Sequence, residues 1–161
     1  MLGNSLRMKK IAPALGIALF LSVKAFAAEE VRVGAYIHDI QHLDVKTHSY
    51  SVDMYIGLRW RDGGLNPAAS LEFMDPYELW GHVRTMEHEK PIRLPSGEWY
   101  QVIRNRGRFS KKLLLNKYPF DKHVLTVEFE DSRLSTAGLK YVPDGEPIAV
   151  NPALKLPGFK V

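Results

Sequence analysis

The sequence predicts an all-β protein, either a β-sandwich or a barrel, and three features of the chain indicate this class. Over residues 50–61, apolar and polar side chains alternate six times in succession, and a two-residue period of this length is typical of a strand with one buried face. Other alternating stretches are short and are separated by turn sequences such as Asp62-Gly63-Gly64 and Pro95-Ser96-Gly97. Little of the chain has a helical pattern, and many short strands between turns favour a sandwich or a barrel.

The first predicted strands lie at 31–40 and 50–60. In the first, Val31, Val33, Ala35 and Ile37 alternate with polar residues or glycine. In the second, which is the clearest in the chain, the apolar face consists of Tyr50, Val52, Met54, Ile56, Leu58 and Trp60. Because Trp60 ends this face, we expect it to lie in the core, with Asp62 capping the turn that follows.

The next predicted strand covers 99–109, after an irregular stretch that prolines break into short pieces. Loops with a short helix or strand are expected over 65–90. The strand at 99–109 places Arg104, Arg106 and Arg108 on one face. We expect this basic face to be solvated and to pair with Glu128 and Glu130 across the sheet, although Arg104 could instead bind a ligand.

A turn followed by a strand is predicted over 116–131. Pro119 fixes its own φ and favours an extended Tyr118, and the short carboxylate of Asp121 can accept backbone N–H groups and close the bend. Beyond the bend, Leu125, Val127 and Phe129 share an apolar face, which predicts a half-buried strand. A short strand at Tyr141-Val142, a turn at 143–145 and a loop-like tail complete the chain.

Residues 1–27 have the three parts of a secretory signal peptide. Three basic residues precede an apolar run over 11–23, and Ala25-Phe26-Ala27 supplies the small residues of a cleavage site. The alternative, an uncleaved anchor, is disfavoured because the run is shorter than the about 20 residues of a spanning helix. We therefore expect an exported chain, periplasmic or extracellular, with one folded domain over 28–161.

Removal of this leader changes the charge balance. The full sequence has 22 Lys and Arg against 18 Asp and Glu, and four of the basic residues but none of the acidic ones precede Glu29. The remaining chain therefore carries 22 − 4 = 18 basic residues against 18 acidic ones and is formally neutral. A basic surface for nucleic acid is not indicated. The chain also has no cysteine, so its stability must come from packing.

No catalytic or metal-binding pattern is found, and we expect neither an enzyme nor a cofactor. The six histidines have no metal-ligand spacing, and the chain has no phosphate-binding glycine loop, nucleophile elbow or thiol. Glu87 and Glu89 could be imagined as paired acids for glycoside cleavage, but acids two apart in a loop are usually solvated. The function is therefore expected to be binding.

Several motifs resemble the family of pentameric ligand-gated ion channels. Tyr118-Pro119-Phe120-Asp121 is similar to the F/Y-P-F-D core of the family's Cys-loop, and Trp60-Arg61-Asp62 is similar to its W-x-D motif. The distance in sequence from the turn at Gly97 to Asp121 matches the family's spacing from the turn before the sixth strand to the loop. Leu156-Pro157-Gly158-Phe159 is similar to the segment that leads into the family's ninth strand. The two loop cysteines of animal members would fall on Lys111 and Leu125, so the chain resembles the cysteine-less bacterial branch.

This resemblance implies an immunoglobulin-like β-sandwich, the neurotransmitter-gated ion-channel ligand-binding domain. Such domains assemble as a ring of five, here a homo-pentamer, and bind a small molecule between subunits. The family's last two strands and its four membrane helices are not found in this sequence, so the sandwich is expected to be incomplete at its C-terminus and to lack the pore. The coupling loop that touches the membrane domain would be Tyr118, Pro119, Phe120 and Asp121.

The resemblance also implies two sides of a ligand pocket. Tyr55, Trp99 and Gln101 would form the complementary side, and Phe73 and Ser132 the principal side. Because Ser132 stands where cation-binding members carry an aromatic residue, an aromatic cage for an amine would be incomplete. A carboxylate ligand could instead be bound by two parallel hydrogen bonds from an arginine guanidinium. The candidates are Arg59, Arg104, Arg106 and Arg133.

Two other functions remain open from the sequence. One is a free-standing periplasmic binding protein of the same fold, and the other is a carbohydrate-binding or hydrolase-accessory β-sandwich. A glycan-binding protein should lose its binding when Trp99 is substituted. Because an incomplete sandwich leaves an exposed strand edge, the isolated chain is expected to be monomeric or weakly associated.

Overall fold

The computed structural model describes residues 27–117 and 120–159 and is an all-β fold, as predicted. The expected signal peptide therefore lies outside the described residues except for Ala27. The elements in chain order are β1 (Glu29–Asp44), β2 (Ser49–Trp60), α1 (Pro67–Ser70), β3 (Leu71–Phe73), η1 (Leu79–Gly81), β4 (Val83–Met86), β5 (Ile92–Arg93), β6 (Trp99–Ser110), β7 (Phe129–Asp131) and β8 (Leu139–Val150). Helix is confined to two short turns.

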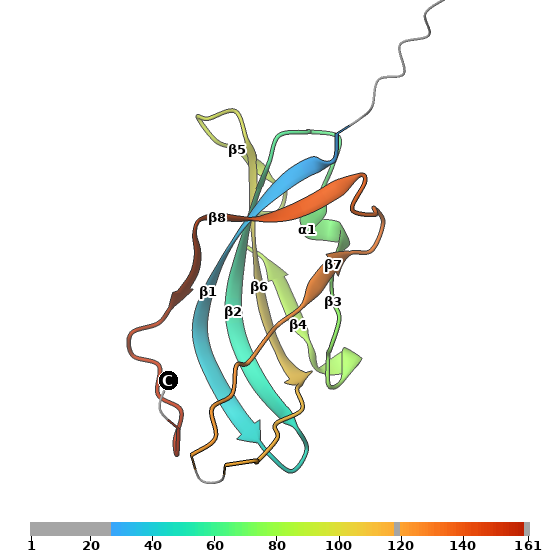
Figure 1. Ribbon diagram of the computed structural model, residues 1–161. Helices are drawn as coiled ribbons and strands as arrows, with labels where there is room; N and C mark the ends of the chain where they lie inside the picture. Colours follow the sequence, from blue (N-terminus) through green and yellow to red (C-terminus); the bar gives the residue numbers. More distant parts are fainter. Residues whose placement is uncertain (1–26, 118–119, 160–161) are drawn as a thin grey trace, which may run out of the picture.

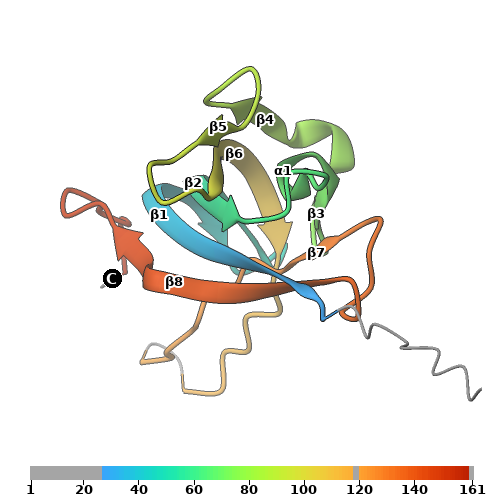
Figure 2. The ribbon, with the colours of Figure 1, turned by 90° about the horizontal axis from the view of Figure 1, so that it is seen from above.

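Two sheets make up the fold (Figure 1). The larger has six strands in the order β4-β6-β2-β1-β8, with β5 also pairing with β6. The pairs β1–β2 and β2–β6 are antiparallel, whereas β8 runs parallel to β1. The smaller sheet, β3–β7, is antiparallel and lies across one face of the larger sheet (Figures 1 and 2).

The alternation predicted for 50–60 is confirmed in β2. Tyr50, Val52, Met54, Ile56, Leu58 and Trp60 are each at most 4 % exposed, and the residues that alternate with them are half-buried. The strand lies between β1 and β6, so its backbone groups are paired along both edges. Its buried side chains form the centre of the hydrophobic core.

The small sheet closes the core through aromatic contacts. The ring of Phe73 in β3 meets Phe109 of β6 at 5.5 Å and Phe129 of β7 at 6.4 Å between centroids, both edge to face. Tyr50 stacks on Phe109 at 6.1 Å. Edge-to-face and offset arrangements are the favourable ones for such rings, so these contacts join β2, β6 and the small sheet into one core.

The roles predicted for Trp60 and Asp62 are confirmed. Trp60 is 1 % exposed, and its Nε1 donates to the carbonyl of Leu65 at 3.1 Å. Asp62 Oδ1 accepts the N–H of Gly64 at 2.8 Å, which caps the turn after β2. Glu29 Oε1 accepts the N–H groups of Asp62 and its neighbour Arg61, so the start of β1 also holds this turn.

The strand predicted beyond Asp121 is much shorter than expected. Only Phe129–Asp131 is a strand, although Leu125, Val127 and Phe129 do pack against the core as predicted. Before β7, the carbonyl of Glu128 accepts the N–H of Met74 at 3.0 Å, but residues 124–128 form no strand ladder. This segment is also held through Thr126, whose carbonyl accepts the Tyr50 hydroxyl at 2.6 Å and whose Oγ1 accepts Lys111 Nζ at 2.8 Å.

The last strand, β8, is longer than the short strand predicted at Tyr141-Val142. β8 continues through the expected turn at 143–145. The register against β1 steps from Val33–Pro143 to Ala35–Ile148, so the turn residues form a bulge within the strand. Proline is tolerated there because β8 is an edge strand.

Gly107 provides a test of the packing between β6 and the residues before β4. A Cβ at this position would lie 2.4 Å from the ring of His82, whereas a Cβ at Gly145 in the β8 bulge would meet nothing within 4 Å. We expect Gly107→Ala to lower the free energy of unfolding by about 1–3 kcal/mol through overpacking. Gly145→Ala is the matched control and should change it by less than about 0.5 kcal/mol. Equal urea midpoints for the two variants would contradict this packing.

Candidate functional site

The three residues expected on the complementary side are separated by the large sheet. Directly opposite partners are Tyr55–Arg104, Leu58–Gln101 and Trp60–Trp99. Since paired residues share a face and successive side chains alternate, Trp99 and Gln101 lie on the core face and Tyr55 lies on the outer face. The structure does not bring these three side chains together on one surface.

Gln101 is engaged in holding a loop. It is 2 % exposed, its Nε2 donates to the carbonyl of His88 at 2.7 Å, and its Oε1 accepts the N–H groups of His88 and Val102 at 3.2 and 3.0 Å. Each polar atom of this amide therefore already has a partner within the chain. Trp99 is half-buried, and the Arg93 guanidinium lies 5.6 Å from its ring centroid.

On the outer face, Tyr55 belongs to an aromatic cluster beside an ion pair. The rings of Tyr36, His38 and Tyr55 lie 6.3–6.4 Å from one another, and the Arg104 guanidinium lies 5.0 Å above the ring of Tyr55. Arg104 Nε and Nη2 donate to the two carboxylate oxygens of Asp53 at 3.0 and 2.7 Å. Two aligned bonds of this kind fix both geometry and charge.

The ion pair shifts the pKa of both partners. The hydrogen bond from Arg104 holds the pKa of the Asp53 carboxyl below its ordinary value, against a smaller opposing effect of burial. The same bond raises the pKa of Arg104. A ligand carboxylate that used the Arg104 fork would therefore have to displace Asp53 or share the guanidinium with it.

The other arginines have different partners from those predicted. The pairing with Glu128 and Glu130 is wrong, because Glu130 lies in the small sheet opposite Glu72. Arg108 donates to the hydroxyls of Ser49 and Thr47 at 3.0 and 2.9 Å. Arg106 is exposed, as expected, and Arg59 Nε lies 3.5 Å from Asp144 Oδ2.

The two residues expected on the principal side lie at opposite ends of the small sheet. Phe73 packs inside, against Phe109 and Phe129. Ser132 directly follows β7, and both its N–H and its hydroxyl donate to the carbonyl of Ser70, at 2.8 and 2.9 Å. Its neighbour Arg133 is exposed and donates its N–H to Asp131 Oδ1 at 2.9 Å.

Asp131 anchors this turn as an ionised carboxylate. Burial opposes its ionisation, but hydrogen bonds from Ser70 and from the N–H groups of Arg133 and Leu134 outweigh that effect and lower its pKa. The turn after β7 is thus fixed by contacts within the chain. The guanidinium of Arg133 remains accessible at its edge.

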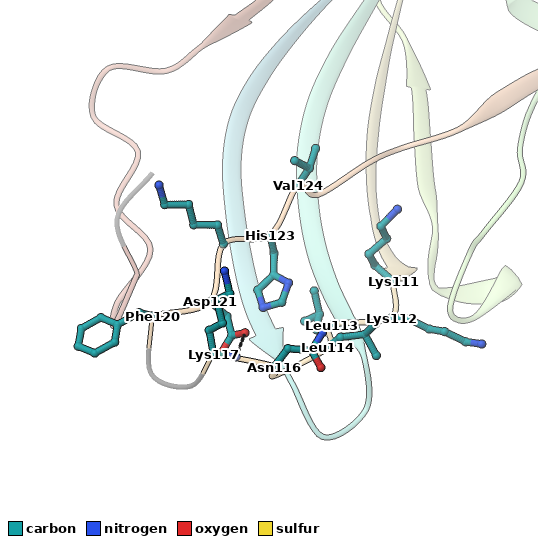
Figure 3. Close-up of a pocket in the computed structure, with 11 residues that line it drawn as sticks. Lys111, Lys112, Leu113, Leu114, Asn116, Lys117, Phe120, Asp121, His123 and Val124 are labelled. Atoms are coloured by element: carbon teal, nitrogen blue, oxygen red, sulfur yellow. Dashed lines mark hydrogen bonds between the residues drawn. The ribbon is translucent and has the colours of Figure 1, made fainter.

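The expected coupling loop is described only in part, because Tyr118 and Pro119 lie outside the described residues. Asp121 Oδ1 accepts the N–H of Lys117 at 2.7 Å, which confirms that this carboxylate closes the bend. Phe120 is 83 % exposed. The loop surrounds a hollow of about 670 Å³, into which Asp121 and His123 project (Figure 3).

None of the residues predicted to bind ligand lines this hollow, whose described lining consists of residues 111–114, 116–117 and 120–124. Among residues 27–117 and 120–159, no group of three or more potential metal ligands comes together. In the same part of the chain, no helix is long and apolar enough to cross a membrane.

Comparison with known proteins provides no family assignment. Neither the scan against protein-family models nor the search among curated proteins gives a match to this chain. Any family relationship therefore depends on the motifs themselves.

Sequence reasoning missed the neighbours of Tyr55 on the outer face. Asp53 lies two residues before Tyr55 on the same polar face of β2, so a carboxylate beside the tyrosine could have been noticed. Its pairing with Arg104 depends on the β2–β6 register, and Tyr36 and His38 depend on the β1–β2 register. Neither register is encoded in a local pattern.

The Asp53–Arg104 pair predicts a pH-dependent contribution to stability. Because the pKa of Asp53 is lower in the folded state, its contribution is present above the unfolded-state value of about 3.9 and is lost as the pH falls through the folded-state pKa. We expect Arg104→Gln to destabilise the protein at pH 7 but hardly at all once Asp53 is protonated. Urea unfolding of both proteins across this range measures the difference.

The control is Arg106→Gln, which removes the same charge from the same face of β6 without breaking a described hydrogen bond. Arg106 lies opposite Asp53 and lowers the pKa of that carboxyl only as the smallest of the contributing causes, so the effect of Arg106→Gln and its change with pH should be smaller than those of Arg104→Gln. A destabilisation by Arg104→Gln that stayed constant down to the acid limit would contradict the role given to Asp53.

Proposed function

We propose that this chain is the ligand-binding domain of a pentameric ligand-gated ion channel of the cysteine-less type. In this proposal the fold is an immunoglobulin-like sandwich, and a small molecule binds between neighbouring copies in a ring of five. The observation that carries the proposal is the order of the matching motifs along an all-β chain. W-R-D stands at 60–62, the Y-P-F-D loop at 118–121 and L-P-G-F at 156–159.

The surroundings of these motifs support the proposal. Trp60 ends the central strand inside the core and Asp62 caps the following turn, so the first motif has a structural role in the fold. Asp121 closes the bend of the second motif. Both motifs thus agree with the local structure around them, which is the consistency expected of one architecture.

The distribution of the ligand-binding residues favours a site made by two chains. Tyr55 and Arg104 lie on the open outer face of the large sheet, whereas Ser132 and Arg133 lie at the turn after β7. These two groups of residues would line one site if the outer face of one copy met the β7 turn of the next copy. Such a site needs no pocket within a single chain. A heterologous contact of this kind closes into a ring when its rotation permits.

The ligand class follows from the charges that flank Tyr55. Arg104 offers a cation and Asp53 an anion within one ion pair, and the rings of Tyr36 and Tyr55 lie beside them. The amine of a small molecule can pair with Asp53 and a carboxylate can pair with Arg104, and either contact replaces part of the Asp53–Arg104 ion pair. The glycan alternative gains less support, because the Trp99 ring is already covered by Arg93.

The test uses purified residues 28–161 and 4-aminobutyrate as a zwitterionic probe. If the ligand binds between copies, it must favour association, because it stabilises only the assembled state. We expect light scattering to show a higher average mass with the probe present, and Tyr55→Ala to abolish the increase. An unchanged mass over the full range of probe and protein concentrations would contradict the proposal.

Tyr77→Ala is the matched control. Like Tyr55, Tyr77 lies beneath an arginine, with the Arg108 guanidinium 4.2 Å from its ring centroid, although Tyr77 is exposed and Tyr55 half-buried. Arg108 lies four residues further along β6 than Arg104. This variant should retain the response to the probe. If both variants lose it equally, the effect does not come from a site at Tyr55.

A further inference from the structure

The loop between β6 and β7 combines positive charge with exposed apolar side chains. We call its described residues, 111–117 and 120–124, the lysine loop. It contains four lysines, Lys111, Lys112, Lys117 and Lys122, and one carboxylate, Asp121. Lys112, Lys117 and Lys122 are exposed, whereas Lys111 is half-buried and its Nζ donates to Thr126 Oγ1 at 2.8 Å. The formal excess over the loop is 4 − 1 = 3 positive charges.

Large apolar side chains of the same loop are also exposed to solvent. The exposed fractions are 62 % for Leu114, 48 % for Leu115, 83 % for Phe120 and 76 % for Val124. Leu113, which is 2 % exposed, anchors the loop to the folded body. In Figure 3 the ring of Phe120 points away from the neighbouring strands. Exposed apolar side chains gathered in one place mark an interaction surface.

The lysine loop lies at one end of the molecule, beside the turn between β1 and β2 (Figure 1). The N–H of Lys111 donates to the carbonyl of His48 at 2.7 Å, and the N–H of Leu113 donates to His48 Nδ1 at 3.2 Å. The base of the loop is thus fixed to that turn. In Figure 3, Phe120 and Lys112 point outward on opposite sides of the loop.

We propose that the lysine loop docks on the surface of an anionic lipid bilayer. Apolar tips that insert at the headgroup boundary, surrounded by lysines that reach lipid phosphates, are the two components of interfacial membrane binding. An acidic protein surface could pair with the lysines, but it would leave Phe120 and Val124 without an apolar environment. The proposal concerns residues 28–161 on their own and is independent of the ligand site. In the complete channel proposed above, Phe120 and Asp121 would touch the membrane domain instead of lipid.

Because the protein as a whole is neutral, an attraction to anionic lipid can be traced to the lysine loop rather than to net charge. Residues 28–161 carry 18 basic and 18 acidic side chains, so the chain as a whole is neutral. Any preference for anionic over neutral lipid must therefore come from the local arrangement of charge. Each lysine near such a surface contributes on the order of five-fold in affinity.

Vesicle co-sedimentation of residues 28–161 tests the proposal. We expect binding to vesicles that contain phosphatidylglycerol, much weaker binding to pure phosphatidylcholine, and a decline with added salt. The triple variant Lys112→Gln, Lys117→Gln, Lys122→Gln should bind the anionic vesicles about a hundred-fold more weakly. These three side chains are exposed, so thermal unfolding should be unchanged.

A charge-matched control removes three exposed basic residues from the other end of the sheet, through Lys90→Gln, Arg61→Gln and Lys140→Gln. It changes the net charge equally and should keep most of the binding. The apolar component is tested by Phe120→Ser, which should weaken binding at least ten-fold, against Ile92→Ser in β5 as its control. Ile92 is 40 % exposed and pairs with Tyr100, far from the lysine loop.

Two outcomes would overturn the proposal. One is wild-type protein that stays in the supernatant with anionic vesicles at physiological salt, which would leave the loop to a protein partner. The other is an equal loss of binding in the lysine-loop variant and its charge-matched control, which would assign the effect to net charge. Neither outcome bears on the ligand response of Tyr55, so the two proposals are tested separately.

Discussion

The two-residue alternation of β2 is the constraint on which the rest of the structure depends. The same strand buries Met54, Ile56 and Leu58 on one face and carries Asp53 and Tyr55 on the other. A slip of one residue would exchange these faces, expose the core and bury the charge, so hydrophobic burial specifies the register strongly. The chemistry of the outer face is therefore fixed by the packing of the inner one.

Local patterns in the sequence were sufficient where a residue acts on its own neighbours. The buried face of β2, the cap at Asp62 and the bend closed by Asp121 each depend on side chains within a few positions of one another. Physical preferences of single residues decide such features. The prediction of an all-β chain followed from the same short-range information.

Features that depend on strands distant in the sequence were not predictable in this way. The stretch before β7 has the alternation of a strand and packs against the core, but only Phe129–Asp131 pairs with another strand. Whether Tyr55 and Trp99 share a face depends on the parity of the β2–β6 register, because opposite residues sum to 159 in this pairing, as Trp60–Trp99 shows. The shared face of Arg104, Arg106 and Arg108 favours the arrangement that buries Trp99, but the individual residue pairs cannot be read from the sequence.

The length of the central strands separates the two surfaces proposed to have a function. Tyr55 is six residues along β2 from Ser49, the end near the lysine loop, which corresponds to about 20 Å. This distance is about twice the screening length at physiological salt, so lipid charge at the loop would act only weakly on the Asp53–Arg104 pair through space. Coupling between the loop and the outer face would have to pass through the packed strands. The buried contacts of Tyr50 with Phe109 and with the carbonyl of Thr126 are one such connection, since they join β2 and β6 to the segment that leads from the loop into β7. The bonds from the loop to His48, just before β2, are another.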